Sequence, residues 1–121
     1  MCIRDRSPSL IAYTAAKSAL TSLTKNLAQT LAPEGILVNT VSPGTFATAS
    51  FKAALAEMPG VDENDLHDVM RFIGEGFGHH VFLDRAADPD EIGPVIAFAA
   101  SARNTYMTGA NINVDGGSDF T

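Results

Sequence analysis

Residues 12–41 read AYTAAKSALTSLTKNLAQTLAPEGILVNTV and indicate the fold class. Apolar side chains recur at spacings of three and four, which predicts an amphipathic helix over residues 12–32. Its apolar positions are Ala16, Leu20, Leu23, Leu27 and Leu31, and we expect them to face the core. The breakers Pro33-Glu34-Gly35 end this pattern, and residues 36–41 then form a short, mostly β-branched run typical of a strand buried on both faces of a parallel sheet. A helix followed at once by such a strand predicts an α/β layered fold.

Residues 45–84 form a longer and less regular segment. Short helices are predicted at residues 50–57 and near residues 63–73, before glycines at 74, 76 and 78. A glycine-punctuated excursion between regular elements is more often a lid or a binding loop than core. Its large apolar side chains are expected to pack within the lid: Met58, Met70 and Phe72.

A capping signature opens the next predicted helix. Asp88 is a candidate N-cap, Pro89 occupies the first helical position and Glu91 the third, ahead of apolar residues at helical spacing. Pro94 lies inside this helix and removes one backbone donor, so we expect a slight bend there. Residues 110–114 then alternate apolar and polar side chains, which predicts a last strand.

Composition and charge exclude several functional classes. With 121 residues, 45% hydrophobic and 18% charged, the chain is long and apolar enough for a single globular unit. A net charge of -6 with eight scattered basic residues argues against nucleic-acid binding. No apolar run approaches the roughly 20 residues that cross a bilayer, and no signal peptide is recognisable, so no membrane partner is expected. The single cysteine, Cys2, cannot form an internal disulfide, and we expect a cytoplasmic setting.

The opening hexapeptide MCIRDR fits neither strand nor helix, and three of its residues are charged. We interpret residues 1–6 as foreign to the protein, with a frayed terminus as an almost equal alternative.

Tyr13 and Lys17 lie one turn apart on the first helix, at the edge of the apolar stripe, where a core meets a cleft. A free phenol is a poor acid or base at neutral pH because its pKa is about 10. A nearby ammonium favours the phenolate, which assists proton transfer to a carbonyl oxygen. Alone, such a pair is most often an edge tyrosine with a solvated lysine.

Five stretches, in order, give this pair more weight. They are YTAAKSAL at 13–20, VNTVSPG at 38–44, RAADPDEI at 85–92, TG at 108–109 and VDGG at 114–117. Together they resemble the short-chain dehydrogenase/reductase family, and five ordered matches over most of the chain are highly specific. The resemblance implies an α/β fold: the C-terminal portion of a doubly wound, Rossmann-like parallel sheet. Residues 7–121 would be the later part of one domain whose first half is missing.

The resemblance also implies roles for single residues. Tyr13 would be the acid/base that exchanges a proton with the substrate oxygen, and Lys17 its partner, which also hydrogen-bonds the nicotinamide ribose. Pro43 and Gly44 would bring the backbone close to the nicotinamide. Two further residues would hold the carboxamide by backbone and side chain: Phe46, where an aliphatic residue is more usual, and Thr48. The function implied is NAD- or NADP-dependent interconversion of an alcohol and a ketone or aldehyde.

Parts of the family pattern are missing. The glycine-rich turn and the residue that selects NAD or NADP are absent, and the catalytic serine would precede Met1, because Ser7 and Ser9 lie too close to Tyr13. The strand at residues 36–41 would also lack one neighbour and leave an open edge. We therefore expect the chain alone to be inactive and poorly stable. The alternative is a non-catalytic binding or regulatory subunit, which would need neither Tyr13 nor Lys17.

Other residues receive simpler interpretations. Asn39, polar within an apolar strand, is expected to make a structural hydrogen bond. Asp115-Gly116-Gly117 is expected to be an architectural turn. His79 and His80 are interpreted as loop residues, with substrate contact as the alternative. No metal site is expected there, since adjacent side chains seldom point the same way and no other His or Cys stands at ligand spacing. The 45–84 segment is apolar with scattered acids, which suits an uncharged alcohol or ketone substrate.

A stripe of small residues predicts a homo-oligomer. Ala15, Ala19 and Ser22 lie away from the leucines and would let another helix approach closely. In the family that it resembles, this helix packs at a subunit interface. Lys25 and Gln29 favour the alternative of a solvated face.

Overall fold

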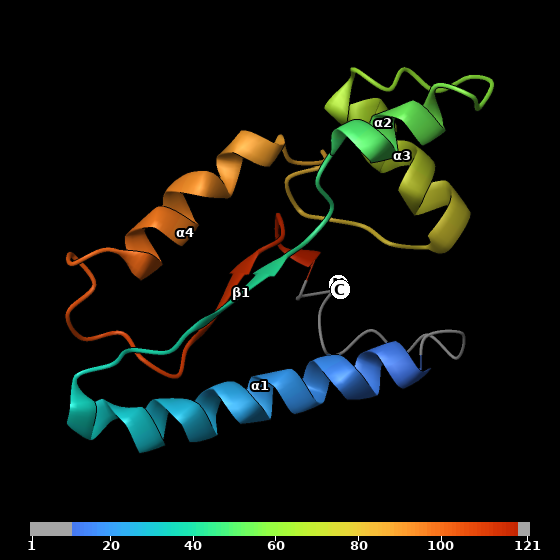
Figure 1. Cartoon of the computed structure of the whole chain (residues 1–121). Coiled ribbons are helices and arrows are strands. Elements are labelled where there is room, and N and C mark those ends of the chain that lie inside the picture. The colour runs from blue at the N-terminus through green and yellow to red at the C-terminus, as the bar shows by residue number, and fades with distance from the viewer. Residues whose placement is uncertain (1–10, 119–121) are drawn as a thin grey trace.

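A computed structural model of the chain describes residues 11–118, so residues 1–6, Ser7 and Ser9 lie outside the described part. The elements in order are α1 (Ile11–Leu31), the 3-10 turn η2 (Ala32–Glu34), β1 (Thr40–Pro43), α2 (Ala49–Leu55), α3 (Leu66–Phe77), the 3-10 turn η3 (Pro89–Glu91), α4 (Gly93–Ala100) and β2 (Asn111–Val114). β1 and β2 pair in parallel, with Thr40 opposite Asn111. Figure 1 shows α1 along one side of the two strands, α4 on the other, and α2 and α3 beyond the end of β1. The predicted α/β fold with a parallel sheet is confirmed.

Helix α1 has the predicted length, but its buried residues are not the predicted leucines. Thr24 and Ala28 are its buried residues, whereas Leu23 is 49% exposed and Leu20 and Leu27 are also exposed. The hydroxyl oxygens of Thr24 and Thr40 lie 2.6 Å apart, so small side chains bring the helix close to β1. The expectation that the leucines form the buried face is therefore wrong for Leu20, Leu23 and Leu27, although Leu20 lies on the side of the helix that faces β1.

Strand β1 begins later than predicted because Asn39 takes over part of the strand pairing. Its side-chain amide donates to the carbonyl of Met107 (2.8 Å) and its side-chain oxygen accepts from the N–H of Ala110 (3.1 Å). The predicted structural role of Asn39 is confirmed. Within residues 11–118 the sheet has only two strands. The expected burial on both faces is wrong there, since Thr40 to Ser42 are half-buried and Pro43 is exposed.

The best-buried core of the described residues lies in the α2–α3 unit, defined here as residues 45–87. Both predicted helices are present with shifted bounds, because Thr48 caps α2 and Asp65 caps α3. Four fully buried side chains form the centre of this unit: Ala47, Leu55, Val69 and Ala86. Met70 is buried and Phe72 packs against the cluster, as predicted, whereas Met58 is exposed and that expectation is wrong.

The capping signature at residues 88–91 forms, but it caps a 3-10 turn. The Asp88 carboxylate accepts from the N–H of Asp90 (2.9 Å), and the Glu91 carboxylate accepts from the N–H of Asp88 (2.7 Å). Helix α4 starts only at Gly93, so Pro94 lies in its first turn, where no intrahelical donor is needed. The bend expected at Pro94 is therefore wrong. In the part of the chain that the structure describes, no helix is long and apolar enough to cross a membrane.

Candidate active site

Tyr13 and Lys17 lie together on the sheet-facing side of α1. The Lys17 ammonium nitrogen is 5.4 Å from the centre of the Tyr13 ring, within the range of a cation–π contact. Spacings of three and four continue this pair through Thr21 to the buried Thr24 and Ala28, so one stripe of α1 carries both the packing residues and the candidate site. Tyr13 is 42% exposed, which leaves the phenol open to solvent or to a ligand.

A hollow of about 100 Å³ lies between α1 and β1. Its walls come from Tyr13, Lys17, Leu20 and Thr21 on the helix and from Thr40, Val41, Ser42 and Pro43 on the strand. The structure thus brings the three predicted residues Tyr13, Lys17 and Pro43 to one hollow. Ser42 is already engaged, because its hydroxyl donates to the Asn111 side-chain oxygen (2.7 Å).

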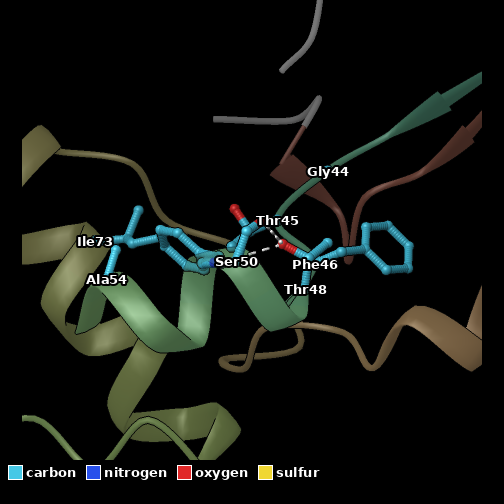
Figure 2. Close-up of a pocket in the computed structure, with 8 residues that line it drawn as sticks. Gly44, Thr45, Phe46, Thr48, Ser50, Ala54 and Ile73 are labelled. Atoms are coloured by element: carbon cyan, nitrogen blue, oxygen red, sulfur yellow. Dashed lines mark hydrogen bonds between the residues drawn. The ribbon is translucent and has the colours of Figure 1, made fainter. Parts of the chain in front are cut away.

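A second, more open hollow of about 580 Å³ lies between the segment after β1 and helices α2 and α3 (Figure 2). It is lined by Gly44, Thr45, Phe46, Thr48, Ser50, Phe51, Ala54 and Ile73, and so contains the other three predicted residues. Figure 2 shows the Phe46 ring on the side opposite Ala54 and Ile73. The phenyl group therefore points away from most of the lining.

Thr48 has a structural role that the sequence analysis missed. Its hydroxyl oxygen accepts from the backbone N–H of Phe51 (3.4 Å) as the N-cap of α2, and it lies 3.3 Å from the Ser50 hydroxyl. A threonine directly before a helix was the available signal. The lining residues from α2 and α3 were also missed, because their convergence depends on tertiary contacts.

Pro43 and Gly44 are neighbours in the chain, but Pro43 lines the smaller hollow and Gly44 lines the larger one. The N–H of Gly44 donates to the Val114 carbonyl (2.9 Å), and a Cβ at residue 44 would lie 2.6 Å from the Asp115 Cα. Only glycine fits there. Gly116 and Gly117 have positive φ, and the Asp115 carboxylate accepts from the Gly117 N–H (3.0 Å), so the architectural interpretation of this turn is confirmed.

Charge is distributed unevenly around the site. Among the described residues that line either hollow, Lys17 alone carries a charge. The carboxylates with displaced pKa values lie elsewhere: Arg85 and the Asp88 N–H lower the pKa of Glu91 to about 2, and the Asp62 N–H and Arg71 lower that of Asp68. The hollows therefore present hydroxyl, backbone and apolar surface, with one cation.

The remaining candidate residues lie apart from these hollows. Within residues 11–118, no group of three His, Cys, Asp or Glu side chains could hold a metal ion. His79 and His80 lie between α3 and η3, and a Cβ at Gly74 would meet the His80 ring at 2.9 Å. Ala15, Ala19 and Ser22 are exposed on α1, and the oligomer predicted from them stays a prediction.

Comparison with known proteins gives consistent matches. A family model described as enoyl-(acyl carrier protein) reductase matches residues 3–119. Acetoacetyl-CoA reductase from Allochromatium vinosum is 42% identical over 105 residues, which are 87% of this chain and 37% of that protein.

Solved structures agree with the sequence matches. A short chain dehydrogenase family protein from Francisella tularensis has a TM-score of 0.75 and 31% identity, covering 98% of this chain and 47% of that chain. YwfH, an NADPH-dependent reductase involved in bacilysin biosynthesis, has a TM-score of 0.73 and 26% identity, covering 95% and 42%. The chain spans less than half the length of each of these three relatives.

Proposed function

This chain belongs to the short-chain dehydrogenase/reductase family, and we propose that it supplies the catalytic tyrosine and lysine of a nicotinamide-dependent oxidoreductase. The reaction proposed is the interconversion of an alcohol and a ketone or aldehyde. Because the chain covers 37% to 47% of the three relatives described above, residues 7–121 would be the C-terminal part of one catalytic domain. The observation that carries the proposal is the Tyr13–Lys17 pair, 5.4 Å from ring centre to ammonium, on the hollow between α1 and β1.

Tyr13 is the proposed proton donor and acceptor. Its hydroxyl would give a proton to the substrate oxygen during reduction and take it back during oxidation. Lys17, on the same face, would stabilise the negative charge that develops on the phenol oxygen. The partial exposure of Tyr13 supports this role, because the hydroxyl must be reachable by a substrate oxygen.

The groups on the two hollows fit the nicotinamide end of NAD or NADP. The phenol and ammonium of the smaller hollow suit the hydroxyls of a ribose, and the Gly44–Phe46 backbone with the Thr48 hydroxyl suits a carboxamide. When bound there, the cofactor would supply or accept the hydride. Both cofactors carry the same nicotinamide ribose, so these residues serve either one.

The lining of the larger hollow favours an uncharged substrate. Its volume of about 580 Å³ is in the range of small-molecule sites. Phe51, Ala54 and Ile73 give it an apolar wall, and its polar side chains are hydroxyls. A phosphate or carboxylate would therefore meet no cation among the described residues that line this hollow. A small alcohol or ketone fits this lining better than a phosphorylated compound.

The deciding experiment is Tyr13→Phe in the full-length protein that contains this chain. Removing a positioned acid/base is expected to lower kcat by about 10²- to 10⁴-fold, with NADH or NADPH binding retained. Tyr106→Phe is the matched control, because Tyr106 is 95% exposed and lines neither hollow. Equal turnover by the two variants would reject catalysis by Tyr13 and favour the non-catalytic binding subunit.

A further inference from the structure

Residues 85–88 form a strap that connects α3 to the segment leaving β1. Three backbone hydrogen bonds of 2.9 Å hold the strap on both sides: Ala86 N–H to the Leu66 carbonyl, Ala87 N–H to the Thr45 carbonyl, and Ala47 N–H to the Ala87 carbonyl. The bonds through Ala87 make a parallel bridge with Phe46. The strap therefore fixes the backbone directly ahead of Thr48 and the larger hollow.

Arg85 and Glu91 close the strap from outside. The Arg85 guanidinium donates to both Glu91 carboxylate oxygens, at 2.8 and 2.6 Å, and also to the Ala86 carbonyl at 3.0 Å. Glu91 in turn accepts from the N–H of Asp88 at 2.7 Å. A bidentate pair fixes the relative orientation of its two charged groups as well as the distance between them. The Arg85–Glu91 pair, called the clamp below, therefore determines where the strap backbone lies.

A second ion cluster in the same chain provides a contrast. Arg71 pairs with Asp68 and Glu75 on the surface of α3, at helical spacings of three and four. The hydrogen bonds of Arg71 run to these two carboxylates and to the Gly60 carbonyl, none of which belongs to the strap. Both clusters are solvent-accessible arginine–carboxylate pairs, but only the Arg85 cluster contacts the backbone that supports the site.

We propose that Arg85 and Glu91 are positioning residues, which hold the nicotinamide-side segment 44–48 in place through the strap. This inference rests on the proposed function for its consequence, because that segment is proposed to hold the carboxamide. The clamp touches neither hollow, and it acts through the chain from Ala87 to Thr45 and Ala47. Loss of the clamp would loosen the carboxamide position and leave Tyr13 and Lys17 in place on α1.

The test compares Arg85→Gln with Arg71→Gln in the full-length protein. Hydrogen exchange of the peptides that carry Ala47 and Ala87 is measured without cofactor, and the dissociation constant is measured by titration with NADH and NADPH. Arg85→Gln is expected to speed exchange in those peptides and to weaken cofactor binding by about tenfold, as for a lost hydrogen bond to a charged group. Arg71→Gln is expected to change neither the exchange rate nor the dissociation constant. Arg85→Lys keeps the charge but loses the bidentate geometry, so both quantities should lie between those of the wild type and Arg85→Gln.

Two outcomes would overturn the inference. One is equal exchange at Ala47 and Ala87 in the Arg85→Gln and Arg71→Gln proteins. The other is a uniform rise in exchange over the whole chain, which would mean a general loss of stability. Should Arg85→Gln fail to fold, Glu91→Gln replaces it with the same expectations. A wild-type protein that binds neither NADH nor NADPH would reject the proposed function, while the exchange comparison would still decide on the clamp.

Discussion

The α2–α3 unit and the layer formed by α1 with the two strands differ in how they bury apolar surface. In the α2–α3 unit, Leu55 and Val69 are fully enclosed by residues of the same unit. In the layer, Leu23 remains half exposed, and the buried residues of α1 are the small Thr24 and Ala28. The α2–α3 unit, which lines the proposed substrate site, thus contains its own core, whereas helix α1, which carries Tyr13, leaves apolar side chains exposed. Three pairs of substitutions and one pH titration test this difference.

The largest effect on stability is expected in the α2–α3 unit. Leu55→Ala should lower the free energy of unfolding by about 2–5 kcal/mol, because it leaves a cavity in a closed core. Leu23→Ala in the same chain should cost no more than about 0.5 kcal/mol, as for an exposed side chain. Urea unfolding of both variants checks the comparison, and equal losses would show that the two regions are buried alike.

A smaller effect on stability is expected at Gly44, in the segment that connects β1 to the α2–α3 unit. Gly44→Ala should lower the free energy of unfolding by about 1–3 kcal/mol, since the new Cβ meets the backbone of Asp115 and overpacks it. Gly76→Ala is the matched control: it lies in α3 with nothing within 4 Å of the new Cβ, and should stabilise by about 0.5–1 kcal/mol. The same sign for both changes in thermal unfolding would contradict the close approach of Gly44 to β2.

A smaller difference is expected between the cap of α3, inside the α2–α3 unit, and the cap of η3, which follows that unit. Asp65 accepts from the N–H groups of His67 and Asp68 at the start of α3, whereas Asp88 caps only the short turn η3. Replacement by alanine should cost about 1 kcal/mol for an average cap, with Asp65→Ala above that value and Asp88→Ala below it. The reverse order in denaturant unfolding would mean that η3 supports more of the fold than α3 does.

The weakest expected effect is the pH dependence of stability. The pKa of folded Glu91 is about 2, below its ordinary value of 4.5, first because of Arg85 and then because of the Asp88 N–H. Its stabilisation is therefore complete above about pH 4.5 and is lost as the pH falls toward 2. Glu91→Gln should flatten the stability curve in that window, modestly because the pair is solvent-accessible and salt-screened. An unchanged acid limb would argue that the clamp is absent in solution.

Local patterns predicted the elements well, and the partners of those elements poorly. The bounds of α1 and β2 were predicted to within about one residue, because periodicity is a property of the segment itself. The leucine stripe was correctly found, but Leu20, Leu23 and Leu27 are exposed, since a pattern shows that a face is apolar and not what lies against it. β1 was displaced because the Asn39 side chain replaces backbone pairing, which no propensity scale contains.

The candidate site divides in the same way. Tyr13 and Lys17 followed from the spacing of one helical turn and from the family resemblance, neither of which requires tertiary contacts to be known. The wall of the larger hollow, with Ala54 and Ile73, depends on Ala86 and Ala87 bonding to two distant segments. Such a wall is a tertiary product and could not be predicted from the sequence alone.

The orientation of the Phe46 ring has a consequence for how this position can vary. The phenyl group points away from Ala54 and Ile73 (Figure 2), while the backbone of Phe46 forms the bridge with Ala87. The side chain of residue 46 therefore contributes little to the wall that Ala54 and Ile73 form. An aromatic residue can therefore replace an aliphatic one at position 46 without changing the shape of the larger hollow beside Ala54 and Ile73.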